Sequence, residues 1–246
     1  ELIKLLTSPH PEQIRLAYEL GITAVMLPEF DRMMETAQET PHHCYNVGEH
    51  TIVALQHCPS DKILRLTMLF HDMGKPEKKT IDENGIAHFK GHALVSEAIA
   101  KEIMHRLKFD NDTLRKVTKL VYYHDLRMPA TPRNVRRAMN RIGTELFPYY
   151  LNLRRADTLA QSMFRRTEKL ENIQEIEKIY LQILEMQQCV SLKDLAVKGN
   201  DLLAAGVERG PQIGETLNKL LELVLEEPEK NEKELLLAEV TKRLKK

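Results

Sequence analysis

The sequence predicts an all-α protein with one short β-hairpin and a small helical C-terminal appendage. Across most of the chain, apolar residues recur at intervals of three and four and seldom at two, which is the period of a helix that buries one face. One segment differs, because β-branched residues flank Asn84-Gly85 at about 80–89 and predict a hairpin with a tight turn. Beyond Ser191, glycines at positions 199, 206, 210 and 214 separate short helical pieces and indicate the appendage.

The helices can be placed in order from their start and stop signals. Asp61 and Thr131 are typical helix N-caps, and Pro132 suits the first helical position. Gly21 should stop the opening helix and be followed by a short turn, and Gly74-Lys75-Pro76 should end a later helix. The helices are expected at 11–21, 46–57, 61–74, 92–107, 111–124, 131–143, 149–164 and 170–188.

Composition excludes several classes of protein. The 246 residues suffice for one large domain or two modest ones, and 36 basic residues balance 36 acidic ones, so net charge does not support wholesale nucleic-acid binding. The three cysteines, Cys44, Cys58 and Cys189, form no C-x-x-C pattern and are expected to be reduced thiols in a cytoplasmic protein. No apolar run approaches the ~18 residues of a membrane span, and no signal peptide is evident, so no membrane association is expected. Because Glu1 is not a natural start, we expect a fragment or an excised domain.

Histidines and aspartates lie on or beside the apolar faces of four helices, and a further histidine opens another helix. A divalent transition metal needs imidazoles and carboxylates that meet at one point, and neighbouring helices of a bundle can supply them. A single histidine on an apolar face is more often a hydrogen-bonded core residue, and a buried aspartate can simply accept hydrogen bonds from nearby arginines. The candidate ligands are His50, His71, Asp72, His92, His124 and Asp157.

The order of this set, H…HD…H…H…D, resembles that of the HD-domain superfamily of metal-dependent phosphohydrolases. The phrases "NVGEHT", "LFHDMGKP", "FKGHALVSEAIA", "VYYHDL" and "RRADTLAQS" carry the resemblance over about residues 41–165. It implies one metal on His50, His71, Asp72 and Asp157, and a second on His92 and His124 with Asp72 bridging. Mn, Fe, Co, Ni or Zn suits such mixed ligands, and Mg is a further candidate. Two metals ~3.5–4 Å apart can activate a bridging water for phosphoester hydrolysis.

Three further residues are candidates for binding the substrate. Lys75 matches a lysine thought to pair with the substrate phosphate in relatives, but it could equally be an exposed lysine favoured by the helix dipole. Arg127 is a second phosphate candidate, and His43 lines the pocket or lies on a surface loop. The remaining histidines, His10, His42, His57, His88 and His105, are assigned structural or surface positions.

The flanking segments resemble those of bacterial tRNA nucleotidyltransferases, the CCA-adding and poly(A)-polymerase-like enzymes. The resemblance extends to "GNDL", "GPQIG" and "PEKN" and suggests three parts: a neck-like segment 1–40, an HD phosphohydrolase domain 41–190 and a helical tail 191–246. No Gly-Ser or Gly-Gly loop followed by Asp-x-Asp is present, so this chain alone should not transfer nucleotides. It is either the C-terminal portion of a longer enzyme or a stand-alone relative without the catalytic head.

Two main functional hypotheses follow. The first is a metal-dependent phosphohydrolase acting on a nucleotide, another small phosphoester or an RNA end, with Asp72 bridging the metals and Lys75 balancing phosphate charge. The second is a tRNA-binding body and tail with a structural or vestigial metal site, and a weaker third is regulation by a bound nucleotide. A basic helix at 131–143, with four arginines, and the Arg154-Arg155 pair offer candidate contacts to an RNA backbone.

Overall fold

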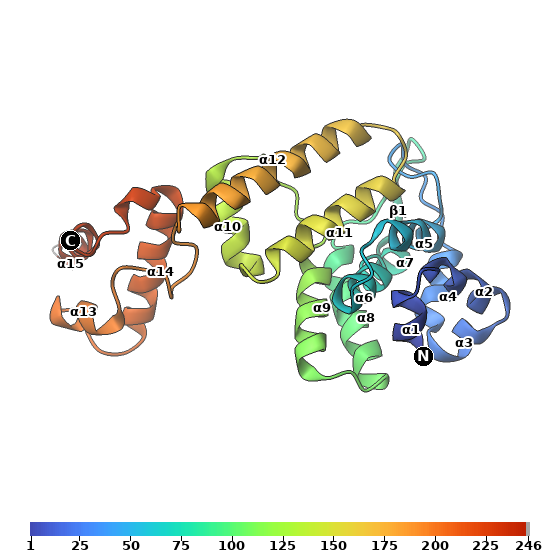
Figure 1. Ribbon diagram of the computed structural model, residues 1–246, viewed down its shortest axis with the longest axis horizontal. Helices are drawn as coiled ribbons and strands as arrows, with labels where there is room; N and C mark the ends of the chain where they lie inside the picture. Colours follow the sequence, from blue (N-terminus) through green and yellow to red (C-terminus); the bar gives the residue numbers. More distant parts are fainter. Residues whose placement is uncertain (245–246) are drawn as a thin grey trace. The chain divides into compact units, whose positions relative to one another are not determined.

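The computed structural model describes residues 1–244, and it is mostly helical with a single two-stranded sheet in that range (Figure 1). The predicted fold class is confirmed. The helices are α1 Leu2–Thr7, α2 Ile14–Glu19, α3 Ile22–Met26, α4 Pro28–Met34, α5 Val47–His57, α6 Lys62–Phe70, α7 Lys75–Lys78, α8 His92–Arg106, α9 Asn111–Tyr123, α10 Pro132–Ile142, α11 Phe147–Ala160, α12 Arg166–Glu185, α13 Gly199–Ala204, α14 Pro211–Glu226 and α15 Lys233–Leu244, with 3-10 turns at Pro11–Gln13 and Pro228–Lys230. No helix in the described range is both long enough and apolar enough to cross a bilayer.

The hairpin forms where the Asn84-Gly85 pair predicted it. Strand β1 (Thr80–Ile81) pairs antiparallel with β2 (Ala87–His88). Gly85 has a φ of +75°, a conformation that suits glycine, and the side chain of Asp82 accepts hydrogen bonds from the backbone of Asn84 (2.9 Å) and Ile86 (3.0 Å). The turn is therefore stabilised by residues that are neighbours in the sequence.

The segment after Gly21 differs from its prediction. Residues 23–30 were expected to form a short turn, but they belong largely to α3 and α4. Pro28 begins α4 rather than breaking a helix, because a proline at the first helical position has no N–H to satisfy.

The chain divides into two compact units, and each has its own core. The first comprises residues 1–127 and 145–174, and the second comprises 128–144 and 175–246. In the first unit, α5 packs against α11, α8 packs against α9, and α6 contacts α1, α5, α9 and α11. In the second, α10 packs against α14, and a core around Leu202, Val224 and Leu236 joins α13, α14 and α15. The three-part division suggested by the flanking resemblance stays a prediction.

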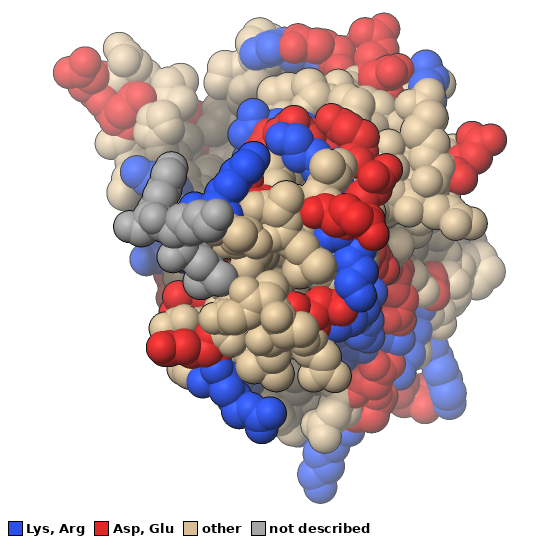
Figure 2. Space-filling model, turned by 90° about the vertical axis from the view of Figure 1, so that its left-hand side faces the viewer, with Lys and Arg blue, Asp and Glu red and all other residues tan. Residues whose placement is uncertain are grey.

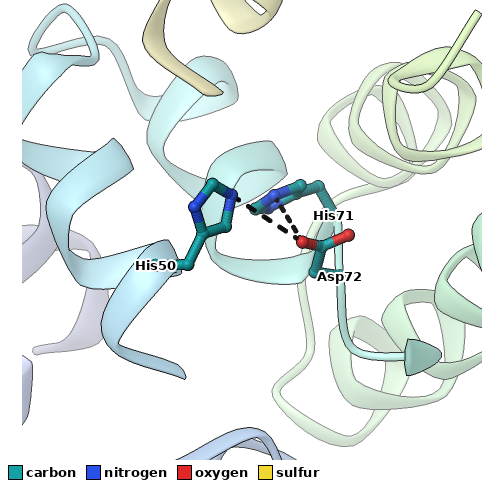
Figure 3. A group of neighbouring side chains, drawn as sticks. All are labelled: His50, His71 and Asp72. Atoms are coloured by element: carbon teal, nitrogen blue, oxygen red, sulfur yellow. Dashed lines mark ion pairs between the residues drawn. The ribbon is translucent and has the colours of Figure 1, made fainter. Parts of the chain in front are cut away.

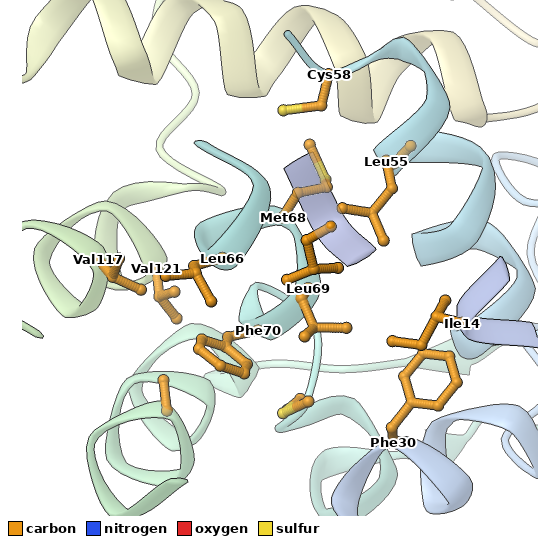
Figure 4. Close-up of a cluster of buried hydrophobic side chains, with 14 of the residues drawn as sticks. Ile14, Phe30, Leu55, Cys58, Leu66, Met68, Leu69, Phe70, Val117 and Val121 are labelled. Atoms are coloured by element: carbon orange, nitrogen blue, oxygen red, sulfur yellow. The ribbon is translucent and has the colours of Figure 1, made fainter. Parts of the chain in front are cut away.

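Helix α6 is the centre of the first unit. Its residues from Leu64 to Phe70 are all buried, so it is enclosed on every side instead of exposing a polar face. Figure 4 shows its side chains between those of α9 and those of the N-terminal helices; the labelled residues include Leu66, Met68, Leu69, Phe70, Val117, Val121, Ile14 and Phe30. Because α6 is enclosed by its neighbours, its C-terminal end is held in place, and the His71-Asp72 pair follows directly after this end.

Helix α6 ends four residues earlier than predicted. The helix ends at Phe70, not at Gly74, and residues 71–74 form turns before α7 begins at Lys75. Gly74 has ordinary helical backbone angles, so it does not serve as a left-handed stop. A Cβ at this position would lie 2.6 Å from the backbone nitrogen of Ser96 and 2.9 Å from Cβ of Val95. Glycine is therefore needed because the first turns of α8 approach this backbone closely.

The arginines of α10 are used inside the second unit. Arg136 is buried and donates to the backbone carbonyls of Leu225 (2.8 Å) and Glu226 (3.1 Å), which end α14. Arg133 and Arg137 each form an ion pair with the Glu226 carboxylate at 2.5 Å. Acidic and basic side chains are also interspersed over the face shown in Figure 2. Three of the four arginines on this helix thus have partners within the second unit, and contact of this helix with RNA stays a prediction.

Candidate metal centre

The six candidate ligands come from five separate places in the first unit, and the fold brings them together. His50 lies on α5, His71 and Asp72 form the turn after α6, and Asp157 lies on α11. His92 is the first residue of α8, and His124 directly follows α9. His50, His71 and Asp72 are almost fully buried, with exposed fractions of 0%, 1% and 2%.

One group forms around His50 and His71. The Nε2 atom of His71 is 3.1 Å from Oδ2 of Asp72, and Nε2 of His50 is 3.9 Å from the same oxygen. Figure 3 shows both rings pointing toward the Asp72 carboxylate. Asp157 completes the group, with Oδ1 at 2.9 Å from Nε2 of His50 and 3.9 Å from Nε2 of His71. Two imidazoles and two carboxylates thus face one point.

A second group uses the other oxygen of Asp72. Its Oδ1 atom is 3.3 Å from Nε2 of His92 and 3.6 Å from Nε2 of His124. The two Nε2 atoms are 3.0 Å apart. In both groups the candidate ligand atoms of the two histidines and Asp72 lie within 4.8 Å of one another. Asp72 is the member common to both groups.

The other nitrogen of each imidazole faces a backbone carbonyl. The Nδ1 atom of His71 lies 2.6 Å from the carbonyl oxygen of Met68. The Nδ1 atoms of His92 and His124 lie 2.8 Å from the carbonyl oxygen of Phe89 and 2.7 Å from that of Val121, respectively. Because a carbonyl only accepts, these Nδ1 atoms carry hydrogen, and in the neutral imidazole each Nε2 then presents its lone pair to the group. Backbone carbonyls orient metal-binding histidines in the same way.

The lone pairs of these histidines need a cation. Nε2 of His71 is buried without a hydrogen-bond partner, and those of His92 and His124 face each other at 3.0 Å. Two facing lone pairs repel unless a proton or a metal lies between them, and a buried acceptor without a partner is costly. The residues therefore fit divalent ions with mixed nitrogen and oxygen ligands.

Lys75 is buried beside the shared carboxylate. Its exposed fraction is 6%, so the alternative of an exposed helix-end lysine is wrong. Its Nζ lies 2.7 Å from Oδ2 of Asp72 and donates to Oε1 of Gln38 at 2.7 Å. Burial raises the pKa of Asp72, but the neighbouring His71 and Lys75 outweigh it and hold that pKa well below its usual range. Asp72 is thus held as an ionised carboxylate between the two histidine groups.

An open pocket of about 540 Å³ leads to the centre, and all three candidate substrate residues line it: Lys75, His43 and Arg127. The His43 ring lies edge-on to His50, with centroids 4.9 Å apart, and burial lowers the pKa of His43 to about 2. His43 is therefore a neutral wall residue. Arg127 is more exposed and forms an ion pair with Asp125 at 2.9 Å.

Two residues of the site were missed from the sequence. Gln161 lines the pocket and donates to Oδ2 of Asp157 at 3.0 Å. Its spacing of four residues from Asp157 places both on one helical face, which is a signal the sequence contains. Gln38 has no such signal, because it lies in a loop and reaches Lys75 only through the fold.

Known proteins are similar to most of this chain. The family described as "tRNA nucleotidyltransferase domain 2 putative" matches residues 79–240. A CC-adding tRNA nucleotidyltransferase of Thermus thermophilus is 33% identical over 230 residues, which are 90% of this chain and 51% of that protein. An A-adding tRNA nucleotidyltransferase of Deinococcus radiodurans is 32% identical over 232 residues, covering 90% of this chain and 52% of that protein.

A third similar protein covers a shorter region. A multifunctional CCA protein of Azoarcus sp. is 30% identical over 113 residues, which are 44% of this chain and 27% of that protein. The chain spans about half the length of the Thermus and Deinococcus relatives. The matched family region contains His92, His124 and Asp157 and begins after the other three candidate ligands.

Proposed function

This chain belongs to the tRNA nucleotidyltransferase domain 2 family, and from that premise we propose that it is a metal-dependent phosphohydrolase of the HD type. Its substrate is a phosphoester of a nucleotide or of an RNA end. One observation carries the proposal: a single buried carboxylate, Asp72, is shared by two histidine groups beside an open pocket. Residues that only stabilise the fold would not be expected to place two groups of histidine lone pairs around one carboxylate at the bottom of a pocket.

The residues have distinct roles in this proposal. His50, His71 and Asp157 would hold one ion, His92 and His124 would hold the other, and Asp72 would serve as a ligand to both. When bound, such ions neutralise phosphate charge and lower the pKa of a water molecule. The backbone carbonyls behind the histidines keep their lone pairs aimed at the ions.

The cationic residues of the pocket act on the substrate. Lys75, fixed between Asp72 and Gln38, contributes a positive charge beside the phosphate, and burial strengthens that interaction. Arg127 lies at the more exposed part of the pocket and His43 at its wall. Lys75 is therefore the residue that we expect to contact the reacting phosphate.

A second candidate function is favoured by the names of the relatives, which act on tRNA as nucleotidyltransferases. In that case the chain is a tRNA-binding portion of such an enzyme, and the metal centre stabilises the fold. A tRNA-binding portion with a structural metal also predicts bound metal, so metal content alone does not separate the two candidates.

Replacement of the shared carboxylate tests the first proposal. Asp72→Asn keeps the size of the side chain but removes the charge that both groups use, whereas Asp112→Asn changes an exposed, ion-paired aspartate of α9. We expect Asp72→Asn to lose metal, measured by inductively coupled plasma mass spectrometry, and to lose hydrolysis of bis-p-nitrophenyl phosphate and 2′,3′-cyclic nucleotides. Asp112→Asn should retain both. Full metal content and full hydrolysis in Asp72→Asn would contradict the proposal.

Titration with tRNA separates the two functions. Binding that is tight and steeply salt-dependent, without hydrolysis by the metal-loaded protein, favours the tRNA-binding portion. Metal-dependent turnover that Asp72→Asn abolishes favours the phosphohydrolase.

A further inference from the structure

Two loops at the mouth of the metal pocket are fastened to each other. Ser162 donates from its backbone nitrogen to the carbonyl of His42 at 2.9 Å and from its hydroxyl to the carbonyl of Pro41 at 2.5 Å. The same hydroxyl accepts from the backbone nitrogen of Phe164 at 3.2 Å. The segments 41–43 and 161–164 therefore present their side chains from a fixed frame.

This frame exposes an aromatic side chain. Phe164 is 49% exposed, and its ring lies against that of His42 with centroids 5.0 Å apart and an interplanar angle of 62°. The neighbouring Met163 is 74% exposed. An exposed aromatic ring held by a second ring offers a flat apolar surface of the kind on which nucleobases stack.

A lysine lies next to this surface. Nζ of Lys169 donates to Oε1 of Gln161 at 2.6 Å and lies 3.2 Å from Nδ1 of His42. These partners are neutral, so they do not offset the charge of the lysine. Burial lowers the pKa of Lys169, and the positive charges of Arg127 and Arg154 lower it further. The charges of Arg127 and Arg154 are partly balanced by Asp125, which lies 2.9 Å and 3.9 Å from them, and Asp157 partly offsets their effect on Lys169; a further anion would be stabilised beside these cations.

The lysine is connected to the metal centre through one side chain. Gln161 accepts from Lys169 and donates to Oδ2 of Asp157 at 3.0 Å. Gln161 and Arg127 also line the metal pocket. An anion at Lys169 would therefore lie beside, and not within, the metal centre.

From this arrangement we propose a second nucleotide subsite, in which the Phe164 ring, held edge-on by His42, stacks on a nucleobase and Lys169 with Arg127 binds the adjoining phosphate. The chemical class of this ligand rests on the proposed function. The substrate is then the end of a single-stranded RNA, with at least one nucleotide beyond the reacting phosphate. His42 and Lys169 become specificity residues, which the sequence did not indicate.

Binding without turnover tests the subsite. Anisotropy of a fluorescein-labelled single-stranded RNA hexanucleotide is measured in the presence of chelator, across salt concentrations. We expect Lys169→Met to weaken RNA binding about tenfold and to reduce the slope of log affinity against log salt by about one phosphate contact. Lys169→Arg keeps the charge, so it should show the affinity and the slope of the wild-type protein. Phe164→Ala should weaken binding about tenfold without changing the salt slope.

Matched controls come from α12. Lys178→Met removes an exposed lysine, and Leu181→Ala removes an exposed apolar side chain; both should bind as wild type. Wild-type affinity in Lys169→Met and Phe164→Ala, or equal losses in Lys178→Met, would overturn the subsite. Because chelator is present, this result does not depend on hydrolysis. Hydrolysis of bis-p-nitrophenyl phosphate by the wild-type protein is measured separately, so failure of the proposed function is recognised on its own.

Discussion

Adding one methyl group at Gly74 should loosen the contact that positions the candidate metal centre. In Gly74→Ala the new Cβ would lie 2.6 Å from the backbone nitrogen of Ser96, whereas ordinary contacts begin at 3.4 Å, so α8 and this turn must move apart by roughly 0.8 Å to reach an ordinary contact. The carbonyl of His92 lies closer still to that Cβ, and backbone atoms have no rotamer by which to move aside. Overpacking of this kind costs roughly 1–3 kcal/mol in free energy of unfolding. This movement also carries His92 away from Asp72.

Two measurements follow this change. Urea unfolding should show a lower midpoint for Gly74→Ala, and titration with Mn or Zn should show metal affinity reduced by about 10- to 100-fold, as when supporting contacts of ligands are lost. Gly214→Ala is the matched control: this glycine lies inside α14 with open space around it, so the same substitution should stabilise by roughly 0.5–1 kcal/mol. An unchanged urea midpoint in Gly74→Ala would refute the close-packing argument, whereas unchanged metal affinity in a destabilised protein would count only against the proposed centre.

Three other predictions concern buried polar groups. Arg65→Met should lower the free energy of unfolding by about 1.5–3 kcal/mol in urea titrations, because the guanidinium donates to three backbone carbonyls in the core; an unchanged midpoint would show that water replaces it. Burial raises the pKa of Cys58 to about 12 and that of Cys189 to about 11, so a thiol reagent at pH 8 should label only the exposed Cys44 before unfolding. Both thiols favour the folded state below their unfolded pKa of about 8.5, and this contribution is lost as pH rises toward the folded pKa values, so urea midpoints should fall above pH 9. Arg136→Met should destabilise the second unit by about 1–3 kcal/mol, since two carbonyls at the end of α14 lose a donor; circular dichroism during urea unfolding would detect it, and an unaltered transition would contradict it.

Some features of this protein could be read from local sequence. The helical period, the Asp61 and Thr131 caps and the Asn84-Gly85 turn depend on neighbours within a few residues, and the structure has each of them. The candidate ligands could also be identified from the sequence, because these histidines and aspartates lie on or beside apolar helical faces. Where those faces meet could be inferred only from a resemblance to a family.

Other features depend on residues far apart in the chain. Lys75 is buried because Gln38 and Asp72 enclose it, and Gly74 is required because α8 returns to the end of α6. The sequence suggests a surface position for Arg136, but its carbonyl partner belongs to α14, far away in the chain. The neighbour of His42 is likewise remote, because Phe164 lies in the loop at 161–164. Local periodicity specifies which face of a helix is apolar, but long-range packing decides what that face meets. That is why the elements and ligand candidates were predictable from the chain alone, whereas burial, ion pairing and the shape of the pocket required the folded protein.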